Sequence, residues 1–340
     1  MQLDKETSEA FRTSEVWKIP LLSIVCPAYE EEDCLPLFHQ ELVAVLDRCA
    51  GEVAVEILYV DDGSRDRTLQ IIKGLASKDA RVRYLSLSRN FGQQAALTAG
   101  LEHARGDLVI TMDSDLQHPP AVIPQLLAKW REGYEIVLTV REDDQRLGVA
   151  KRLTSKMFYW VLGRLSDTDI RPARSDFRLL TRKAVDGLLQ MRERHRFMRG
   201  MVQWLGFSTA EVSFHPNSRK AGHTKYTMRS LLNLASDALF SFSRAPLRLS
   251  FHLGLLALAF SMLIFLVEAW RWLVAGHEAK IGTWLLVSTF FLGGCILWSV
   301  GVLGEYIGRI FEQVKERPVY LVKDHSPEIQ NKSRSQREAA

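Results

Sequence analysis

The stretch GDLVITMDSDLQHPP, residues 106–120, is the most informative part of the chain. Leu108–Met112 is an apolar run of strand length, and Asp113 and Asp115 follow it at once. In an α/β sheet, ligands bind beyond the carboxyl ends of the strands. We therefore predict a buried strand over Leu108–Met112 and a binding site directly after it.

The same alternation of apolar runs and helical patterns continues on both sides of this stretch. Strands are predicted over residues 21–27, 53–60, 82–87 and 135–140, and helices over 34–50, 68–77, 93–104 and 120–131. Strands that alternate with helices indicate βαβ units in an α/β fold, with a mostly parallel sheet covered on both faces. Two further strands end in acidic clusters, PAYEE from Pro27 and DDGS from Asp61. Three acidic clusters should thus meet at one sheet edge.

Crowded carboxylates are costly unless a cation or a hydrogen-bond donor relieves them. Each cluster alone fits a turn or a helix cap, because Asp, Ser and Gly favour both. The chain has no GxGxxG after its first strand and no GxxxxGK[ST], which argues against a dinucleotide oxidoreductase and a P-loop NTPase. The Asp-x-Asp pair offers hard oxygen ligands for Mg²⁺ or Mn²⁺, and such a metal bridges a diphosphate.

The last third of the chain is of another kind. Overall 47% of the 340 residues are hydrophobic and 25% are charged, but Leu253–Val267 and Ile281–Leu303 carry no formal charge. The second run exceeds the roughly 18–20 residues of a membrane-spanning helix, and the first reaches that length by continuing to Trp270. We predict a two-helix transmembrane hairpin within residues 251–307.

Basic residues flank the predicted hairpin on both outer sides, and its connector around residues 276–280 has few. The flanking cations are Arg229, Arg244, Arg248, Arg309, Lys315, Arg317 and Lys323. The positive-inside rule then predicts a multi-pass protein of the inner (cytoplasmic) membrane with its polar body on the cytoplasmic face. The net charge of +4 suits an anionic membrane surface, and no basic stripe interleaved with aromatics indicates a nucleic-acid partner.

Several motifs, in this order and spacing, resemble those of one enzyme family. They are SIVCPAYEEE, ILYVDDGSRDRT, LSRNFGQQAALTAGL, GDLVITMDSDLQHPP, SDFRLLTRKAVDGL, RFMRG, RKAGHTKY, SFSRAPLR and GEYIGRIFEQVKERPVY. From about Leu21 to Val322 the chain resembles the inverting family 2 glycosyltransferases of GT-A fold. Within them it is most similar to the polyprenyl-phosphate branch, which includes dolichol-phosphate mannose synthases and bactoprenol glucosyltransferases.

The resemblance implies a role for each matching residue. The nucleotide sugar would meet Pro27, Tyr29, Glu31, Asp61, Asp62 and Asp113, with Arg219 and Lys225 in a loop that closes over the diphosphate. The metal, Mg²⁺ or Mn²⁺, would be held by Asp113, Asp115 and Gln117. The acceptor phosphate would meet Arg141, Lys151, Arg152 and Ser155. Asp115 and Asp176 would be the catalytic residues, with Asp176 at the reaction centre.

Two positions depart from the family pattern. Glu30 stands where the family has Asn, and Ser175 stands where it has Gly before the reaction-centre Asp176. The added Cβ of Ser175 puts the acceptor-side geometry in doubt. Three roles stay open for Asp176: a base, an orienting group for Arg178 or the acceptor, or a structural ion pair. His118 is interpreted as a residue that starts a helix, with no site role.

The implied division of the chain has five parts. They are a polar segment 1–20, a GT-A catalytic domain 21–229, interfacial amphipathic helices 230–250, the hairpin 251–307, and a C-terminal segment 308–340 whose end, from Ser326 onward, is predicted to be disordered. Residues 231–242 fit either an interfacial helix or a core helix. Pro318–Val322 fits a strand on the chain's own sheet or on that of a neighbouring subunit in a homo-oligomer.

The implied reaction transfers a hexose from a nucleotide sugar to a membrane polyprenyl phosphate, with inversion. UDP-glucose and undecaprenyl phosphate are the first expectations, and GDP-mannose or a formamido-arabinose type of sugar are alternatives. A processive polysaccharide synthase is disfavoured because Gln203-Trp204 does not match its Gln-x-x-Arg-Trp motif. A non-catalytic nucleotide-binding scaffold is disfavoured because the Asp pair and the basic loop are both present.

Overall fold

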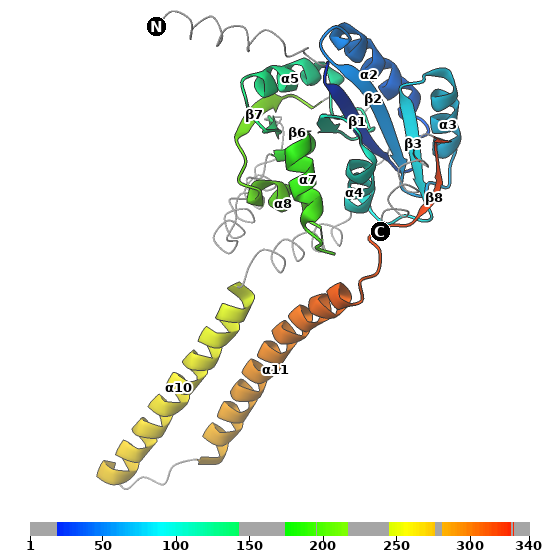
Figure 1. The fold of residues 1–340 in the computed structure, drawn as a ribbon. Coiled ribbons are helices and arrows are strands. Elements are labelled where there is room, and N and C mark those ends of the chain that lie inside the picture. The colour runs from blue at the N-terminus through cyan, green and yellow to red at the C-terminus, as the bar shows by residue number, and fades with distance from the viewer. Residues whose placement is uncertain are drawn as a thin grey trace, which may run out of the picture.

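The structure is a computed structural model that describes residues 19–142, 174–194, 196–216, 245–275, 281–327 and 329. A polar body carries an eight-stranded sheet, and two long helices project from it (Figure 1). The strands are β1 Leu21–Ala28, β2 Ala54–Asp61, β3 Val82–Leu87, β4 Leu108–Thr111, β5 Ile136–Arg141, β6 Arg174–Thr181, β7 Thr209–Phe214 and β8 Val322–His325. The helices are α2 Leu35–Cys49, α3 Thr68–Lys78, α4 Gln93–His103, η1 Pro120–Val122, α5 Ile123–Arg131, α7 Arg182–Gln190, α8 Met198–Trp204, α10 Ala245–Ala275 and α11 Ile281–Val314.

The sheet has the order β7-β5-β6-β4-β1-β2-β3-β8 and is mixed. Strands β4, β1, β2 and β3 run parallel, as the alternating pattern predicted, and β5 pairs parallel with β7. The strand β6 is antiparallel to both of its neighbours, β4 and β5. Because β6 runs backwards, its first residues lie at the edge where β1, β4 and β5 end. This brings Asp176 to the carboxyl ends of the parallel strands.

Helices cover both faces of the sheet, and each face has its own apolar core. In β1 the side chains alternate: Leu22 and Ile24 pack with α2, α3 and α5, while Val25 packs with α4, α7 and α8. Strands buried on both faces read as continuous apolar runs, which is why the sequence identified them. The expected α/β class with a mostly parallel sheet is confirmed.

The C-terminal segment returns to the body after the hairpin. The strand β8 lies antiparallel to β3 at the sheet edge, three to four residues beyond the predicted run Pro318–Val322 and on the chain's own sheet. Ser326 and Ile329 are 2% and 3% exposed, and the Ser326 amide donates to the Tyr84 carbonyl at 3.0 Å. The prediction of disorder from Ser326 onward is therefore wrong for these residues, since β-pairing and burial order them.

The helices α10 and α11 are long and apolar enough to cross a membrane, by length and composition. The candidate spans are Ser250–Val267, with a mean hydropathy of 2.2, and Phe291–Val314, with 1.4. They form an antiparallel pair below the body (Figure 1). Only 12% and 6% of the two spans are buried inside the protein, so their apolar side chains face outward. Residues 230–244 of the predicted interfacial segment lie outside the described residues, and 245–250 form the first turns of α10.

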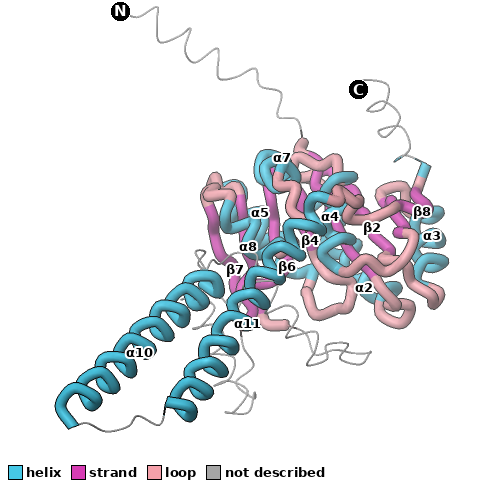
Figure 2. Tube along the Cα trace, turned by 90° about the horizontal axis from the view of Figure 1, so that it is seen from below, coloured by secondary structure: helices cyan, strands magenta, loops and turns pink. Residues whose placement is uncertain are grey.

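The C-terminal end of α11 contacts the body (Figure 2). With 34 residues the helix is about 51 Å long at ~1.5 Å per residue, which exceeds a hydrocarbon core of about 30 Å. Gln313 near its end donates to the Arg192 carbonyl at 2.6 Å and accepts from the Arg194 amide at 2.8 Å. Arg194 also pairs with Glu312 at 3.4 Å. These contacts join α11 to the segment between α7 and α8.

Candidate active site

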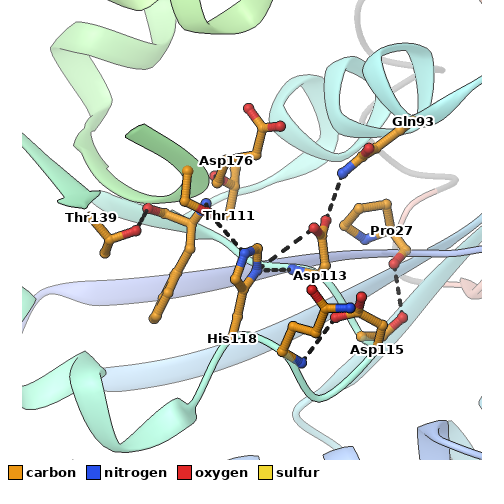
Figure 3. Close-up of polar contacts among 12 residues, drawn as sticks. Pro27, Gln93, Thr111, Asp113, Asp115, His118, Thr139 and Asp176 are labelled. Atoms are coloured by element: carbon orange, nitrogen blue, oxygen red, sulfur yellow. Dashed lines mark hydrogen bonds and ion pairs between the residues drawn. The ribbon is translucent and has the colours of Figure 1, made fainter. Parts of the chain in front are cut away.

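The acidic residues predicted after β4 form a compact turn, Asp113–Gln117, which we name the carboxylate loop. The Gln93 side-chain amide donates to Asp113 Oδ1 at 2.7 Å, and the Gln117 amide donates to Asp115 Oδ1 at 3.0 Å. The Ser114 hydroxyl donates to the carbonyl of Pro27 at 2.9 Å, which ties the loop to the end of β1. Figure 3 shows Asp113 and Asp115 on this turn, with Pro27 and Gln93 beside them.

Two features of the carboxylate loop mark it as more than a turn. Leu116 is 3% exposed and has a φ of 65°, a left-handed conformation that is uncommon for a bulky residue. Burial raises the pKa of Asp113, and the negative charges of Asp176 and Asp115 raise it further. Strained backbone and crowded carboxylates persist where the surrounding structure holds them, and both cluster at functional sites.

These residues fit a divalent cation. The two carboxylates are hard oxygen donors on one short loop. Burial first, and then the charges of Asp176 and Asp115, raise the pKa of Asp113, and a bound cation would favour its charged form. The described residues contain no group of three or more His, Cys, Asp or Glu side chains that forms a metal centre by itself. A metal would thus be held by Asp113 and Asp115, with Gln117, and by the donor diphosphate, as Mg²⁺ commonly is.

Asp176 lies on β6 and is held by two arginines. Its carboxylate forms an ion pair with Arg178 on the same strand, and it accepts from Arg199 Nη2 of α8 at 3.1 Å. The side chains of Asp176 and Arg178 are 6% and 4% exposed, whereas that of Arg199 is 37% exposed. Burial acts to raise the pKa of Asp176, but the charges of Arg199 and Arg178 outweigh it and lower the pKa to about 2. At neutral pH this group is a charged anchor for two guanidinium groups.

The predicted nucleotide residues lie at the ends of β1 and β2. Pro27 is buried, and Tyr29 and Glu31 are half-buried beside it. Asp61 accepts from the Ser64 amide at 3.0 Å and the Ser86 hydroxyl at 2.8 Å. These contacts hold the carboxylate in place at the end of β2.

Asp62 has a clear structural role. Its two carboxylate oxygens accept from the amides of Phe91 and Gly92 at 2.8 and 2.9 Å, which fixes the start of α4. Burial raises the pKa of Asp62, and these two amide hydrogen bonds lower it. Asp62 therefore positions the helix that carries Gln93 toward Asp113.

The structure explains the departure at Glu30. This residue is exposed and has a φ of 53°, and its amide donates to the Ser64 hydroxyl at 3.0 Å. Asn adopts this left-handed conformation more readily than Glu does. The Glu30 side chain interacts with Tyr29, so the substitution costs backbone energy and places a negative charge beside a residue of the expected nucleotide wall.

The acceptor side is described only in part. Arg141 ends β5, is exposed, and lies opposite Phe214 of β7, at the same sheet edge as the carboxylate loop. The other predicted phosphate contacts lie outside the described residues. They are Lys151, Arg152, Ser155, Arg219 and Lys225.

Three residues of this site escaped the sequence analysis. Gln93 and Arg199 sit inside motifs that carried the resemblance, LSRNFGQQAALTAGL and RFMRG, but their partners are distant in sequence. His118 was interpreted as a helix-starting residue, and it does lie two residues before η1, which begins at Pro120. It is also 8% exposed and contacts both Asp113 and Ser175 through its two ring nitrogens. The interpretation of His118 was therefore incomplete.

Known proteins with similar sequences identify the family of this chain. A model of glycosyl transferase family 2 matches residues 23–189. A prophage-derived bactoprenol glucosyl transferase of Shigella flexneri is 42% identical over 305 residues, which cover 89% of this chain and 97% of that protein. An uncharacterised glycosyltransferase of Synechocystis is 42% identical over 307 residues, covering 89% and 95%.

Among solved structures, glucosyl-3-phosphoglycerate synthase of Mycobacterium tuberculosis with Mn²⁺, UDP-glucose and phosphoglyceric acid is 20% identical. The match has a TM-score of 0.43 and covers 65% of this chain and 78% of that one. The family assignment rests on the full-length relatives, whose identity is far above the level at which fold alone is shared. This chain belongs to glycosyl transferase family 2.

Proposed function

We propose that this chain transfers a hexose, glucose first among the candidates, from a nucleotide sugar to the phosphate of a membrane polyprenyl phosphate, with inversion. The observation that carries the proposal is that two groups lie at the same sheet edge. One is the carboxylate loop, and the other is Asp176 with Arg178 and Arg199. One side suits a metal-bound nucleoside diphosphate and the other suits an anion. Similarity to a bactoprenol glucosyl transferase over almost the whole chain supports this lipid acceptor and this sugar.

The chemistry needs two anions close together and little proton transfer. A phosphate monoester has a second pKa near ~6, so the acceptor is largely a dianion at neutral pH and is already a nucleophile. It attacks the anomeric carbon while the bond from that carbon to the nucleoside diphosphate breaks on the opposite face. The leaving diphosphate carries away the electron pair, and the configuration inverts.

Asp176 acts in this proposal as an orienting residue. A carboxyl with a pKa of about 2 is a poor base at neutral pH, and both of its oxygens already accept from arginines. Arg199 is the more exposed of the two partners, and its planar guanidinium suits a phosphate. We infer that Asp176 aims Arg199 at the acceptor phosphate, with Arg141 adding charge from the end of β5.

The carboxylate loop serves the donor. Asp113 and Asp115, with Gln117, would hold Mg²⁺ or Mn²⁺, which when bound neutralises charge on the leaving diphosphate. Gln93 and the backbone amide hydrogen bonds of the loop fix the two carboxylates before any ligand arrives. Pro27, Tyr29, Glu31 and Asp61 form the expected nucleotide wall, and Asp62 keeps α4 and Gln93 in place.

The membrane location follows from α10 and α11. Their exposed apolar surfaces suit a lipid environment, and the basic residues on the outer flanks orient the body toward the cytoplasm of the inner membrane. This topology has its own test. A cysteine at Gly276, between the helices, should react with an impermeant thiol reagent added outside intact cells, and one at the exposed Glu132 of the body should not. The opposite labelling pattern would contradict a cytoplasmic site.

The function itself is tested with a panel of radiolabelled nucleotide sugars. Membranes containing the protein are incubated with undecaprenyl phosphate, Mg²⁺ or Mn²⁺, and UDP-glucose, GDP-mannose or a formamido-arabinose donor in turn. Radioactivity in the organic phase should rise with UDP-glucose and require both the metal and the lipid. An inactive Asp115→Asn membrane preparation is the matched control. No lipid-linked product with any donor would refute the proposed reaction.

A further inference from the structure

We propose that His118 and Ser175 form a side-chain bridge that positions the carboxylate loop against the strand carrying Asp176. The bridge gives a positioning role to two residues outside the reacting atoms, although His118 Nδ1 also lies 3.7 Å from Asp113 Oδ2. It rests on the proposed function for what is being aligned, the donor diphosphate on one side and the acceptor on the other. The contacts of the bridge are observed in the structure and do not depend on the proposed function.

Both ring nitrogens of His118 are engaged. The Asp113 amide donates to Nδ1 at 2.9 Å, so Nδ1 presents its lone pair and the ring proton lies on Nε2. Nε2 lies 2.8 Å from the Ser175 hydroxyl oxygen and donates to it. Ser175 Oγ also accepts from the Phe177 amide at 3.2 Å. The imidazole thus connects a backbone amide of the loop to a side chain of β6 across 57 residues of sequence.

Aromatic packing holds the ring in this orientation. The His118 ring stacks on Phe177 with centroids 5.3 Å apart and an interplanar angle of 27°. Its other contact is an edge-on approach to Phe214 of β7, at 5.9 Å. Figure 3 shows the ring between Asp113 and the strand that carries Asp176. A buried side chain packed on two rings has few rotamers, so the bridge has a defined length.

The bridge begins where the sheet ends. The last register pair between β4 and β6 joins Thr111 to Arg178, and the Thr111 hydroxyl donates to the Asp176 carbonyl at 2.6 Å. Beyond that point the two segments of the chain separate, one into the carboxylate loop and the other into the start of β6. His118 and Ser175 span this gap directly beside Asp113 and Asp176.

The consequence for the reaction is geometric. Displacement at the anomeric carbon depends on an in-line approach, and an error of about 1 Å in placement costs a large factor in rate. Asp113 and Asp115 position the donor, and Asp176 with its two arginines positions the acceptor. The separation of these two sets beyond the sheet depends on the bridge. Ser175, which replaces the Gly of the family pattern, thus supplies the hydroxyl at one end of the bridge.

Three variants isolate the bridge. Ser175→Ala removes the hydroxyl, and His118→Asn keeps an acceptor for the Asp113 amide but has no group that reaches Ser175. Each should lower kcat by roughly two- to tenfold, the effect of one hydrogen bond, and Ser175→Ala, which does not touch Asp113, should leave the calorimetric donor Kd unchanged. The double variant should lose no more than either single variant, because both remove the same interaction.

A matched control uses Thr139, which is fully buried and whose hydroxyl donates to the Phe177 carbonyl at 2.6 Å. Thr139→Val removes a hydrogen bond to the same strand without touching the carboxylate loop, and should leave kcat at the wild-type value. Amide hydrogen exchange of the peptide 112–118 gives a readout that needs no activity. It should speed up by the same two- to tenfold in Ser175→Ala and stay unchanged in Thr139→Val.

The exchange measurement separates this proposal from the proposed function. If wild-type membranes transfer no sugar to polyprenyl phosphate, the function is wrong, and the exchange rates still decide the bridge. Unchanged exchange of 112–118 in Ser175→Ala overturns the bridge. Additive losses of kcat in the double variant, or equal losses in Thr139→Val, also overturn it.

Discussion

Replacement of Asp176 by Asn should destabilise the body by about 2–5 kcal/mol and abolish transfer, because it leaves Arg178 charged in a buried site. The lower figure comes from the pKa, which is about 2 in the folded protein against an ordinary value of 3.8. At about 1.4 kcal/mol per unit, that difference is worth about 2 kcal/mol. The upper figure is typical of breaking a buried ion pair by removing one partner.

The sign of the pH dependence follows from the same shift. The pKa of Asp176 is depressed on folding, so its contribution is present above the ordinary value of 3.8 and is lost as the pH falls toward 2. Asn cannot ionise, so its variant should lose this acid dependence. Arg199 is 37% exposed and can turn to solvent in the variant, so most of the cost arises at Arg178.

The assay is thermal unfolding in detergent, followed through the body, together with organic-phase transfer counts. A loss of about 2–5 kcal/mol should lower Tm by roughly 4–20 °C for a domain of this size. Glu132→Gln is the matched control, since its pair with Lys129 is exposed to solvent and contributes little to stability. The double variant Asp176→Asn/Arg178→Met should regain stability, because no buried charge is orphaned, but should not regain transfer. A wild-type Tm in Asp176→Asn would refute the buried pair, and transfer by the double variant would refute the functional role.

Three further predictions address the donor side, the backbone and the acceptor side. Asp115→Asn should abolish transfer with an unchanged circular dichroism spectrum, and full activity of this variant in EDTA would contradict the metal assignment. Gly63→Ala should lower the free energy of unfolding by at least roughly 1–3 kcal/mol, because Gly63 has a φ of +70° and an added Cβ would lie 2.4 Å from the Arg89 carbonyl carbon. The control Gly74→Ala, a helix position with open space around it, should stabilise by up to about 1 kcal/mol in the same thermal measurement. Arg141→Ala should raise the acceptor KM or lower kcat roughly ten- to hundredfold while calorimetry shows an unchanged donor Kd, and a weakened donor with normal acceptor kinetics would rule out this assignment.

The sequence predicted the parallel half of the sheet because its strands are buried on both faces. Leu21–Ala28 and Leu108–Thr111 read as almost continuous apolar runs, and their helices follow at short spacing. The carboxylate loop was predictable for the same reason, since a cluster at the end of a recognisable strand has a known place in the fold.

The strand β6 was not predicted, although its motif was recognised. Its sequence RSDFRLLT carries charges at alternate positions, and Asp176 and Arg178 are buried at 5% and 3% exposure. Charged residues that are buried as an ion pair interrupt the apolar pattern, so hydrophobic periodicity does not identify such a strand. Arg199 and His118 were missed because their partners are set by tertiary structure: Asp176 lies 23 residues from Arg199, and Ser175 lies 57 residues from His118.

The strand β8 was predicted a few residues too early for a related reason. The apolar run Val319–Val322 is attractive as a strand, but the paired residues are Val322–His325, with the sequence VKDH. Pairing with β3 and the contact of Lys73 with Asp324 at 2.6 Å select this register. Edge strands depend on their partner more than on their own propensity.

The position of β8 in the chain has a consequence for how the protein is made. Synthesis on the ribosome proceeds from the N-terminus, so strands β1 to β7 and both apolar helices emerge before Val322–His325 does. Until then β3 has an open edge, and open edges invite pairing with other chains. In the proposed membrane topology, α10 and α11 therefore leave the ribosome before the enzyme's own sheet is complete. A shortened protein that stops before α10 would keep β3 uncovered, so a soluble form of the enzyme is best obtained by joining residues 320–329 back to the body.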